Sequence, residues 1–180
     1  MLLKEKMWKT VLDILFPKHC LNCYKKGTYL CDDCKALINI SNRYETGVDY
    51  LDYLFWAGPY KDRIIKACLY AFNQKYVKEL ANELSDLIIT YIRLMDNCPI
   101  LKKQLSIIPM PISKKKLKKQ GFNPSYEIAL QISKKLNIPF GKDKTILLIN
   151  DIYVPEMQEY AKKLKQKTSQ EVWGLVVARQ

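Results

Sequence analysis

The chain has 180 residues, of which 48% are hydrophobic and 11% aromatic, which fits one globular domain with a small appendage and excludes an intrinsically disordered protein. Its 30 Lys and Arg against 18 Asp and Glu give a formal net charge of +12, which suggests a polyanionic partner such as nucleic acid or a phosphorylated metabolite. Nearly all of these basic residues are Lys, however, and an AT-rich coding sequence would enrich lysine without selection for binding. Both interpretations stay open.

Residues 2–16 predict an amphipathic helix that ends before Pro17. The segment lacks the small-residue cleavage site of a secretory signal, and no apolar run in the chain approaches the roughly 20 residues of a membrane span. We therefore expect a cytoplasmic protein without a transmembrane segment. We expect the helix to pack against the rest of the protein rather than on a membrane surface.

Four cysteines carry the strongest signal in the sequence. Cys20 and Cys23 form one CxxC motif, and Cys31 and Cys34 form a second after seven intervening residues. Two such motifs supply four thiolates to one ion, so the spacing predicts a structural zinc site in a small zinc ribbon. His19 is the only histidine and is expected to be a bystander, which excludes Ser–His and Cys–His nucleophilic catalysis.

Strands and helices alternate after the cysteines. Strands are predicted at 50–60, 105–112, 145–149 and 171–179, and helices at 62–72, 76–95, 124–136 and 157–164. Strands separated by helices predict a twisted parallel sheet with flanking helices, hence an α/β fold. We expect the N-terminal helix and zinc ribbon to occupy residues 1–45 and the α/β domain residues 46–180.

A basic loop precedes the third of these helices. Five lysines crowd into it, and Asn123 follows as the predicted N-cap before Pro124 at the first helical position. The lysines are Lys114, Lys115, Lys116, Lys118 and Lys119. With Asn123 they form a candidate phosphate- or nucleic-acid-binding segment, and the alternative is a solvated loop without a ligand.

These segments together resemble the ComF (GntX-like) group of bacterial proteins, which is linked to natural competence and DNA uptake. The resemblance is carried, in order, by LDILFPKHCLNC…YLCDDC, AGPYKDRIIKACLY, IIPMPISKKKLKKQGFNPS, ILLINDIY and EVWGLVVAR. It implies a zinc ribbon joined to a type I phosphoribosyltransferase-like domain, whose phosphoribosyl site lies at the carboxyl ends of the strands.

The resemblance also implies that the phosphate site is degenerate. The family carries two acidic residues after ILLI and then a Thr-Thr-Gly-x-Thr loop, which together hold the ribose hydroxyls and the 5′-phosphate of phosphoribosyl pyrophosphate. Here Asn150 replaces the first acid and only Asp151 remains. Val154 and Pro155 stand in place of the two threonines, and Glu156 brings a negative charge near the position of the glycine.

We therefore expect a catalytically impaired relative that binds nucleic acid, such as single-stranded DNA, or a protein of the DNA-uptake machinery. No catalytic residue is assigned beyond the residual Asn150 and Asp151. One alternative is an active phosphoribosyltransferase, in which case Mg²⁺ would accompany phosphoribosyl pyrophosphate. Another is a decayed or truncated family member with little function.

Overall fold

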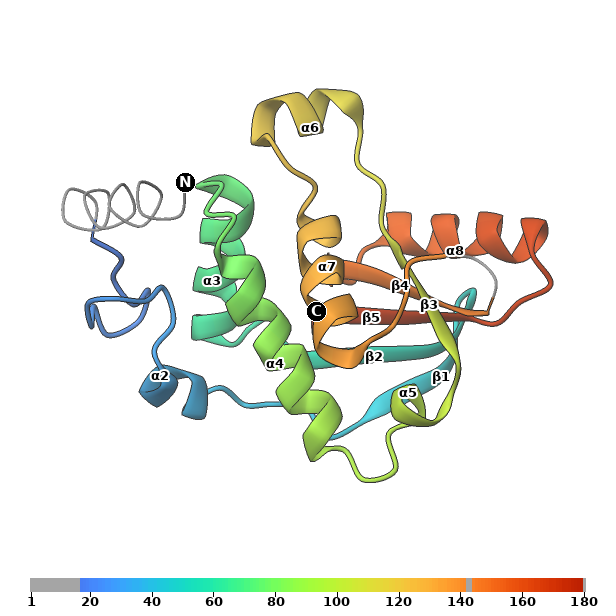
Figure 1. Cartoon of the computed structure of the whole chain (residues 1–180), viewed down its shortest axis with the longest axis horizontal. Helices are drawn as coiled ribbons and strands as arrows, with labels where there is room; N and C mark the ends of the chain where they lie inside the picture. The colour runs from blue at the N-terminus through green and yellow to red at the C-terminus, as the bar shows by residue number, and fades with distance from the viewer. Residues whose placement is uncertain (1–16, 142–143, 180) are drawn as a thin grey trace, which may run out of the picture.

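A five-stranded sheet with the order β1-β2-β5-β4-β3 forms the centre of the molecule (Figure 1). The structure, a computed structural model, describes residues 17–141 and 144–179, so the helix expected at residues 2–16 lies outside the described residues. The strands are β1 (Tyr44–Val48), β2 (Leu51–Pro59), β3 (Leu105–Pro109), β4 (Thr145–Ile152) and β5 (Val172–Arg179). Strands β2, β5, β4 and β3 run parallel, which confirms the predicted α/β class.

Helices cover both faces of the sheet because parallel strands must bury both faces. The described helices are α2 (Asp32–Ala36), α3 (Arg63–Gln74), α4 (Leu80–Leu94), α5 (Pro99–Lys102), α6 (Lys114–Gln120), α7 (Pro124–Leu136) and α8 (Pro155–Lys167). Helices α3, α4 and α7 share one hydrophobic cluster with Leu147 and Leu175 of the sheet. Helix α8 packs on the opposite face, in a second cluster that includes Leu148 and Val176.

Close packing of α8 on the sheet depends on Gly174 in β5. A Cβ atom at this position would lie 2.8 Å from Leu51 Cδ1 and 3.0 Å from Met157 Cε. A side chain at this position would therefore force the ends of the Leu51 and Met157 side chains to shift.

One predicted helix start is confirmed by its cap, and another helix begins earlier than predicted. The Asn123 side chain accepts hydrogen bonds from the N–H groups of Ser125 and Tyr126 at the start of α7. Helix α8 covers the predicted segment 157–164 and begins earlier, with Pro155 at its first position.

The sheet differs from the prediction at three places, the first of which is β3, which ends at Pro109 instead of at residue 112. Strand β1 is an additional, antiparallel edge strand, which pairs with β2 through a tight turn around Asp49. Strand β4 was expected to end at Ile149 but continues to Ile152, because Asn150 and Ile152 pair with Val176 and Ala178 of β5. The two polar residues Asn150 and Asp151 therefore lie within the strand.

The short helices α2 and α5 were not predicted, and two further helices differ from the prediction. Helix α4 begins at Leu80 rather than at Tyr76, since Tyr76 has a left-handed backbone with φ of 57°. The lysine-rich segment is helix α6 instead of a loop. Ser113 caps its start by accepting the N–H of Lys116, and Gly121 ends it in the left-handed conformation with φ of 79°.

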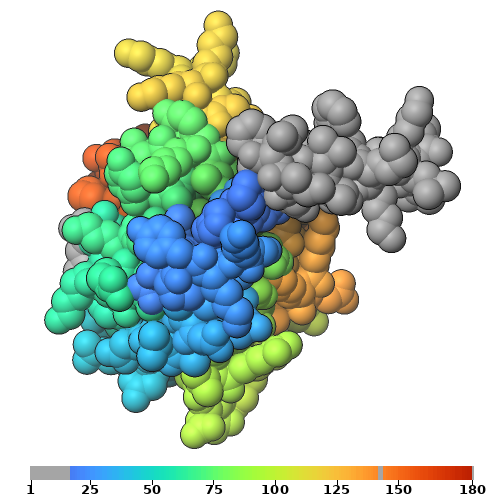
Figure 2. All heavy atoms as spheres, turned by 90° about the vertical axis from the view of Figure 1, so that its left-hand side faces the viewer, coloured from blue at the N-terminus to red at the C-terminus, as the bar shows by residue number. Residues whose placement is uncertain are grey.

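The residues around the four cysteines pack directly against the α/β domain. We call residues 18–38 the cysteine module. Cys20, Leu30 and Cys34 belong to the same hydrophobic cluster as Ile65 and Phe72 of α3. In the space-filling view the module (blue) lies against the neighbouring teal and green segments (Figure 2). The domain boundary at residue 45 stays a prediction.

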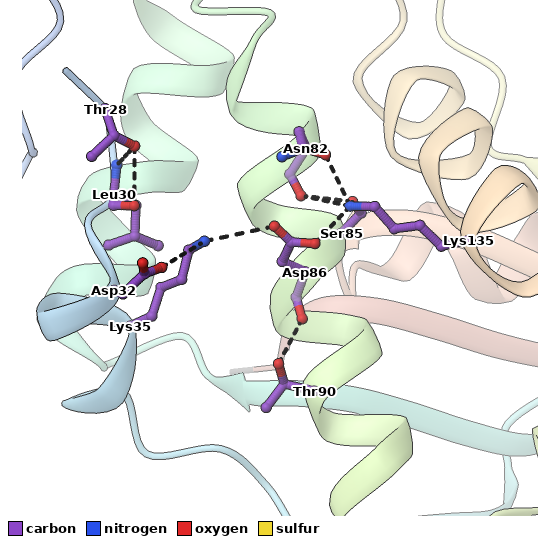
Figure 3. Close-up of polar contacts among 9 residues, drawn as sticks. All are labelled: Thr28, Leu30, Asp32, Lys35, Asn82, Ser85, Asp86, Thr90 and Lys135. Carbon is purple, nitrogen blue, oxygen red and sulfur yellow. Dashed lines mark hydrogen bonds and ion pairs between the residues drawn. The ribbon is translucent and has the colours of Figure 1, made fainter.

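A network of charges ties the module to two helices of the domain. Asp86 of α4 pairs with Lys35 of α2 at 3.6 Å and with Lys135 of α7 at 2.7 Å (Figure 3). The Lys135 ammonium also donates to Ser85 and to Asn82. Because all three ionic side chains are about two-thirds buried or more, this network restricts the relative positions of the three helices more than an exposed pair would.

Candidate functional site

The four predicted metal ligands lie together. The Sγ atoms of Cys20, Cys23, Cys31 and Cys34 are all within 4.8 Å of one another, and all four cysteines are free. Four thiolates 2.3 Å from one tetrahedral ion would be about 3.8 Å apart, so the cluster needs little rearrangement to enclose it. The cluster could therefore bind a metal such as zinc.

The local backbone structure brings the four sulfur atoms close together. Cys20 and Cys23 lie on a hairpin closed by hydrogen bonds from Cys20 N to Lys25 O and from Gly27 N to Lys18 O, both 2.9 Å. Cys31 is the N-cap of α2, and Cys34 lies one turn further along that helix. In the part of the chain that the structure describes, the module is thus a hairpin and a helical turn with a single β-bridge, rather than a multistranded ribbon.

The environment of the thiols favours ionisation of one of them. Burial acts to raise the pKa of Cys20, but backbone N–H groups of Cys23, Cys31 and Asn22 outweigh it and lower the pKa to about 6. The Asn22 amide, 3.2 Å from Cys34 Sγ, acts to lower the pKa of Cys34, yet burial and the neighbouring thiols raise it to about 12. Four such groups cannot all ionise without a cation between them.

A second candidate site lies at the carboxyl edge of the sheet. A cavity of about 590 Å³ opens beyond the ends of β3 and β4, between α3, α6 and the start of α8. In parallel α/β sheets, this edge is where ligands bind. The structure brings the predicted residues Asn150, Asp151 and Lys116 to its wall.

Asp151 is held by a side chain that the sequence did not single out. Asn73 of α3 donates its amide N–H to Asp151 Oδ2 at 2.6 Å. Burial raises the pKa of Asp151 above its ordinary value, while the Asn73 hydrogen bond and the positive charge of Lys116 act to lower it. Asp151 is therefore a carboxylate whose charge is poorly compensated, in a cavity that a cationic or hydrogen-bond-donating ligand could enter.

Asn150 is committed to contacts within the protein. Its Oδ1 accepts the Ser125 hydroxyl of α7 at 2.6 Å, and its Nδ2 donates to the carbonyl of Ile152 at 2.7 Å. A carboxylate at this position could not donate to Ile152. Asn150 thus contacts α7 whereas Asp151 contacts α3, although both line the same cavity.

The start of α8 is poor in donors for a phosphate. Pro155 has no N–H, and the N–H of Met157 already donates to the carbonyl of Val154 at 3.0 Å. No side chain caps this helix end. The exposed Glu156 also lines the cavity and adds a negative charge where a phosphate would approach.

The predicted basic residues divide into two groups. Lys116 lines the cavity, whereas the other four lysines of α6 do not contribute to its wall. All five lysines are exposed, and none forms an ion pair with another described residue. Asn123 has a structural use, since its Oδ1 caps α7 and its Nδ2 donates to the carbonyl of Met110. A binding role for Asn123 stays a prediction.

Three cavity residues escaped the sequence reasoning. Asn73, Lys66 and Tyr60 lie on α3 or just before it, far in sequence from Asn150 and Asp151. The predicted helix ended at Phe72, whereas α3 continues to Gln74 and so includes Asn73, and nothing in the sequence showed which strand end this helix would face. These three residues come close to Asp151 only because α3 packs beside the carboxyl edge of the sheet.

The raised pKa of Asp151 makes stability depend on pH. Between the ordinary carboxyl pKa of 3.8 and the raised value, the folded protein holds more protons than the unfolded chain, so its stability falls as pH rises through that window. Asp151→Asn, which keeps the Asn73 hydrogen bond, should therefore raise the melting temperature near pH 7 by a few degrees, about 2–4 °C per kcal/mol, and lose this gain near pH 3.

Thermal unfolding of both proteins between about pH 3 and pH 7.5 checks this. Asp96→Asn, at an exposed aspartate, is the matched control and should leave the melting temperature unchanged across the series. A melting temperature that drops on Asp151→Asn at pH 7 would show that the carboxylate stabilises the fold, contrary to this expectation.

No family model matches the sequence, and no curated protein matches it either. The likeness to ComF proteins therefore rests on the motifs described above. What the structure supports is a cluster of four cysteines near the N-terminus, followed by an α/β domain with a mostly parallel five-stranded sheet. Among the described residues, no helix is long and apolar enough to cross a bilayer.

Proposed function

We propose that this protein is a catalytically impaired, ComF-like protein that binds single-stranded nucleic acid, with helix α6 as the main contact to the phosphate backbone. One observation carries the proposal. Five lysines occupy a seven-residue helix that stands away from the sheet beside the cavity, and no acidic side chain among the described residues neutralises them. A helix of this kind suits sequence-independent contacts to phosphates.

Two further features support binding over catalysis. The start of α8 lacks the backbone donors and the glycine that a bound 5′-phosphate needs. The cavity beside α6 presents aromatic side chains together with Lys66, and Tyr70 at its wall is 59% exposed. Exposed aromatic rings beside cations offer surfaces on which bases of a single strand stack.

Salt dependence tests the nucleic-acid contact. Binding of single strands weakens with a log–log slope of about −0.7 per phosphate contact, so contacts from five lysines predict a roughly 100-fold loss of affinity between 50 and 200 mM salt. Replacing Lys115, Lys118 and Lys119 by Gln should make the slope shallower by up to about 2 and weaken binding at low salt. Fluorescence anisotropy with a labelled oligothymidylate measures both quantities.

A charge-matched control separates local contact from bulk charge. Lys162, Lys163 and Lys167 are exposed on α8, on the other face of the sheet, and their replacement by Gln gives the same net charge. This variant should retain the wild-type slope. Equal effects of the two triple variants, or wild-type binding that is absent or insensitive to salt, would contradict a specific role for α6.

An active phosphoribosyltransferase is the second candidate, and the position of the cavity favours it. The cavity lies where this fold places its ligands, and Asp151 remains at its wall. Calorimetric titration of phosphoribosyl pyrophosphate with Mg²⁺ at low-millimolar ligand distinguishes the candidates. We expect no saturable binding, because α8 lacks phosphate donors. Saturable binding that Asp151→Asn abolishes would instead place the protein among the enzymes.

The cysteine cluster is proposed to hold one structural zinc ion. Four sulfur ligands fill a tetrahedral shell and leave no position for a reacting water molecule. In this role the ion fastens the hairpin to α2 and completes the core shared with α3. A module of about 20 residues has too small a core of its own to remain folded without such a link.

Metal analysis and thermal unfolding test the zinc site. Cys34→Ser should release the metal and lower the melting temperature by about 10 °C or more, and a chelator should do the same to the wild type. Cys98→Ser is the matched control, since Cys98 is also buried but lies outside the cluster, and it should keep one zinc per chain. Folded wild-type protein that contains no metal and does not respond to zinc or chelator would disprove the site.

A further inference from the structure

A second cavity lies at the same edge of the sheet, beyond the ends of β2 and β5. Its volume is about 530 Å³. Three cations, two aromatic rings and one carboxylate line it, namely Arg43, Lys61, Arg179, Trp56, Tyr60 and Glu45. The sequence singled out none of these residues as a binding group, although three of the six are basic.

Arg179 is fixed in place within this cavity. Its guanidinium lies 4.8 Å from the centre of the Trp56 ring and 5.7 Å from that of Tyr153, and it forms an ion pair with Glu45. Trp56 is itself 6% exposed, so it serves as a floor beneath the guanidinium. A planar cation held in this way presents a flat surface at little entropic cost on binding.

The other two cations remain available to a ligand. The side chains of Arg43 and Lys61 are exposed and form no ion pair with a described residue. Since Glu45 already pairs with Arg179, the cavity keeps two uncompensated positive charges. Such charges on exposed side chains attract an anion without a large desolvation penalty.

Tyr60 connects this cavity to the first one. It lines both cavities, and its backbone N–H donates to the carbonyl of Arg179 at 2.7 Å, which fixes it at the end of the sheet. The Nζ atom of Lys66 lies 5.9 Å from the centre of the Tyr60 ring. Basic and aromatic side chains therefore follow one another along the carboxyl edge, from α6 through the first cavity to the second.

We infer that the second cavity is a subsite for the same single strand of nucleic acid, in which Arg43 and Lys61 contact phosphates and a base stacks on Tyr60 or on the guanidinium of Arg179. This inference rests on the proposed function and extends it by naming the path of the strand. A strand that contacts α6 continues along the edge of the sheet to this subsite. Alternating cations and rings of this kind are the means by which proteins hold single strands without reading sequence.

The test uses the full-length, zinc-loaded protein and oligothymidylates of increasing length. Arg43→Gln with Lys61→Gln should make the salt slope shallower by about 1.4 with long oligonucleotides, and should have no effect with the shortest ones that α6 alone can hold. Arg93→Gln with Lys102→Gln removes the same charges from exposed positions, in the last turn of α4 and in α5, and should change neither slope.

A separate affinity measurement tests whether a base stacks on Tyr60. Tyr60→Leu should weaken binding of a long oligonucleotide at least about fivefold, whereas Tyr60→Phe, which keeps the ring, should retain wild-type affinity. Melting temperatures of all variants verify that they are folded. Equal losses for the Leu and Phe variants would rule out stacking on Tyr60.

The outcomes separate this inference from the proposed function. If the wild type binds single strands and only the α6 variant weakens binding, the subsite is disproved and the proposed function stands. If the wild type does not bind at all, both fail. If the variant with Arg43→Gln and Lys61→Gln loses affinity, and the loss increases with oligonucleotide length, the subsite is supported.

Discussion

The burial of both faces of strands β4 and β5 is the constraint on which the remainder of the structure depends. From Ile146 to Ile149 and from Val172 to Ala178, every side chain that extends from these strands is nearly inaccessible to water. Helices must therefore cover both faces, and Gly174 leaves room for the side chains of Leu51 and Met157. The polar residues Asn150 and Asp151 of β4 lie near its carboxyl end, where they line the first cavity.

That edge differs from a phosphoribosyl site in the origin of its hydrogen-bond donors. A phosphate cradle uses backbone N–H groups at a helix start, whereas here Pro155 and the Met157–Val154 hydrogen bond remove two of them. The donors and charges come instead from long side chains on α3 and α6, such as Lys66 and Lys116. Flexible cations of this kind suit an extended polyanion better than a small ligand that must be held in one orientation.

The cysteine module contributes to the cavity although it lies outside it. Its residues pack on the same helix, α3, that supplies Asn73 and Lys66 to the cavity wall. Asp86 further links Lys35 of the module to Lys135 of α7, whose first turn holds Asn150 through Ser125. A metal bound by the four cysteines would thus stabilise the two helices that position Asp151 and Asn150, because the module shares a hydrophobic cluster with α3.

The sequence by itself determined the features that depend on short-range patterns. Hydrophobic periodicity showed the four parallel strands and the four long helices, paired CxxC spacing showed which cysteines would meet, and Asn123 before Pro124 marked the start of α7. Each of these follows from contacts between neighbours in the chain or from the needs of a single ion. The segment 153–157 after β4 contains neither glycine nor threonine, which was likewise visible without a structure.

Only the tertiary structure decided the features that depend on contacts between distant segments. Strand β4 continues through Asn150 and Asp151 because β5 offers it hydrogen bonds, and the two side chains separate because one reaches α7 and the other α3. Likewise Arg179 lies on Trp56 because β5 ends beside β2, a neighbour that precedes it by more than a hundred residues. The order of the strands sets these contacts, and strand order is not encoded in any local pattern.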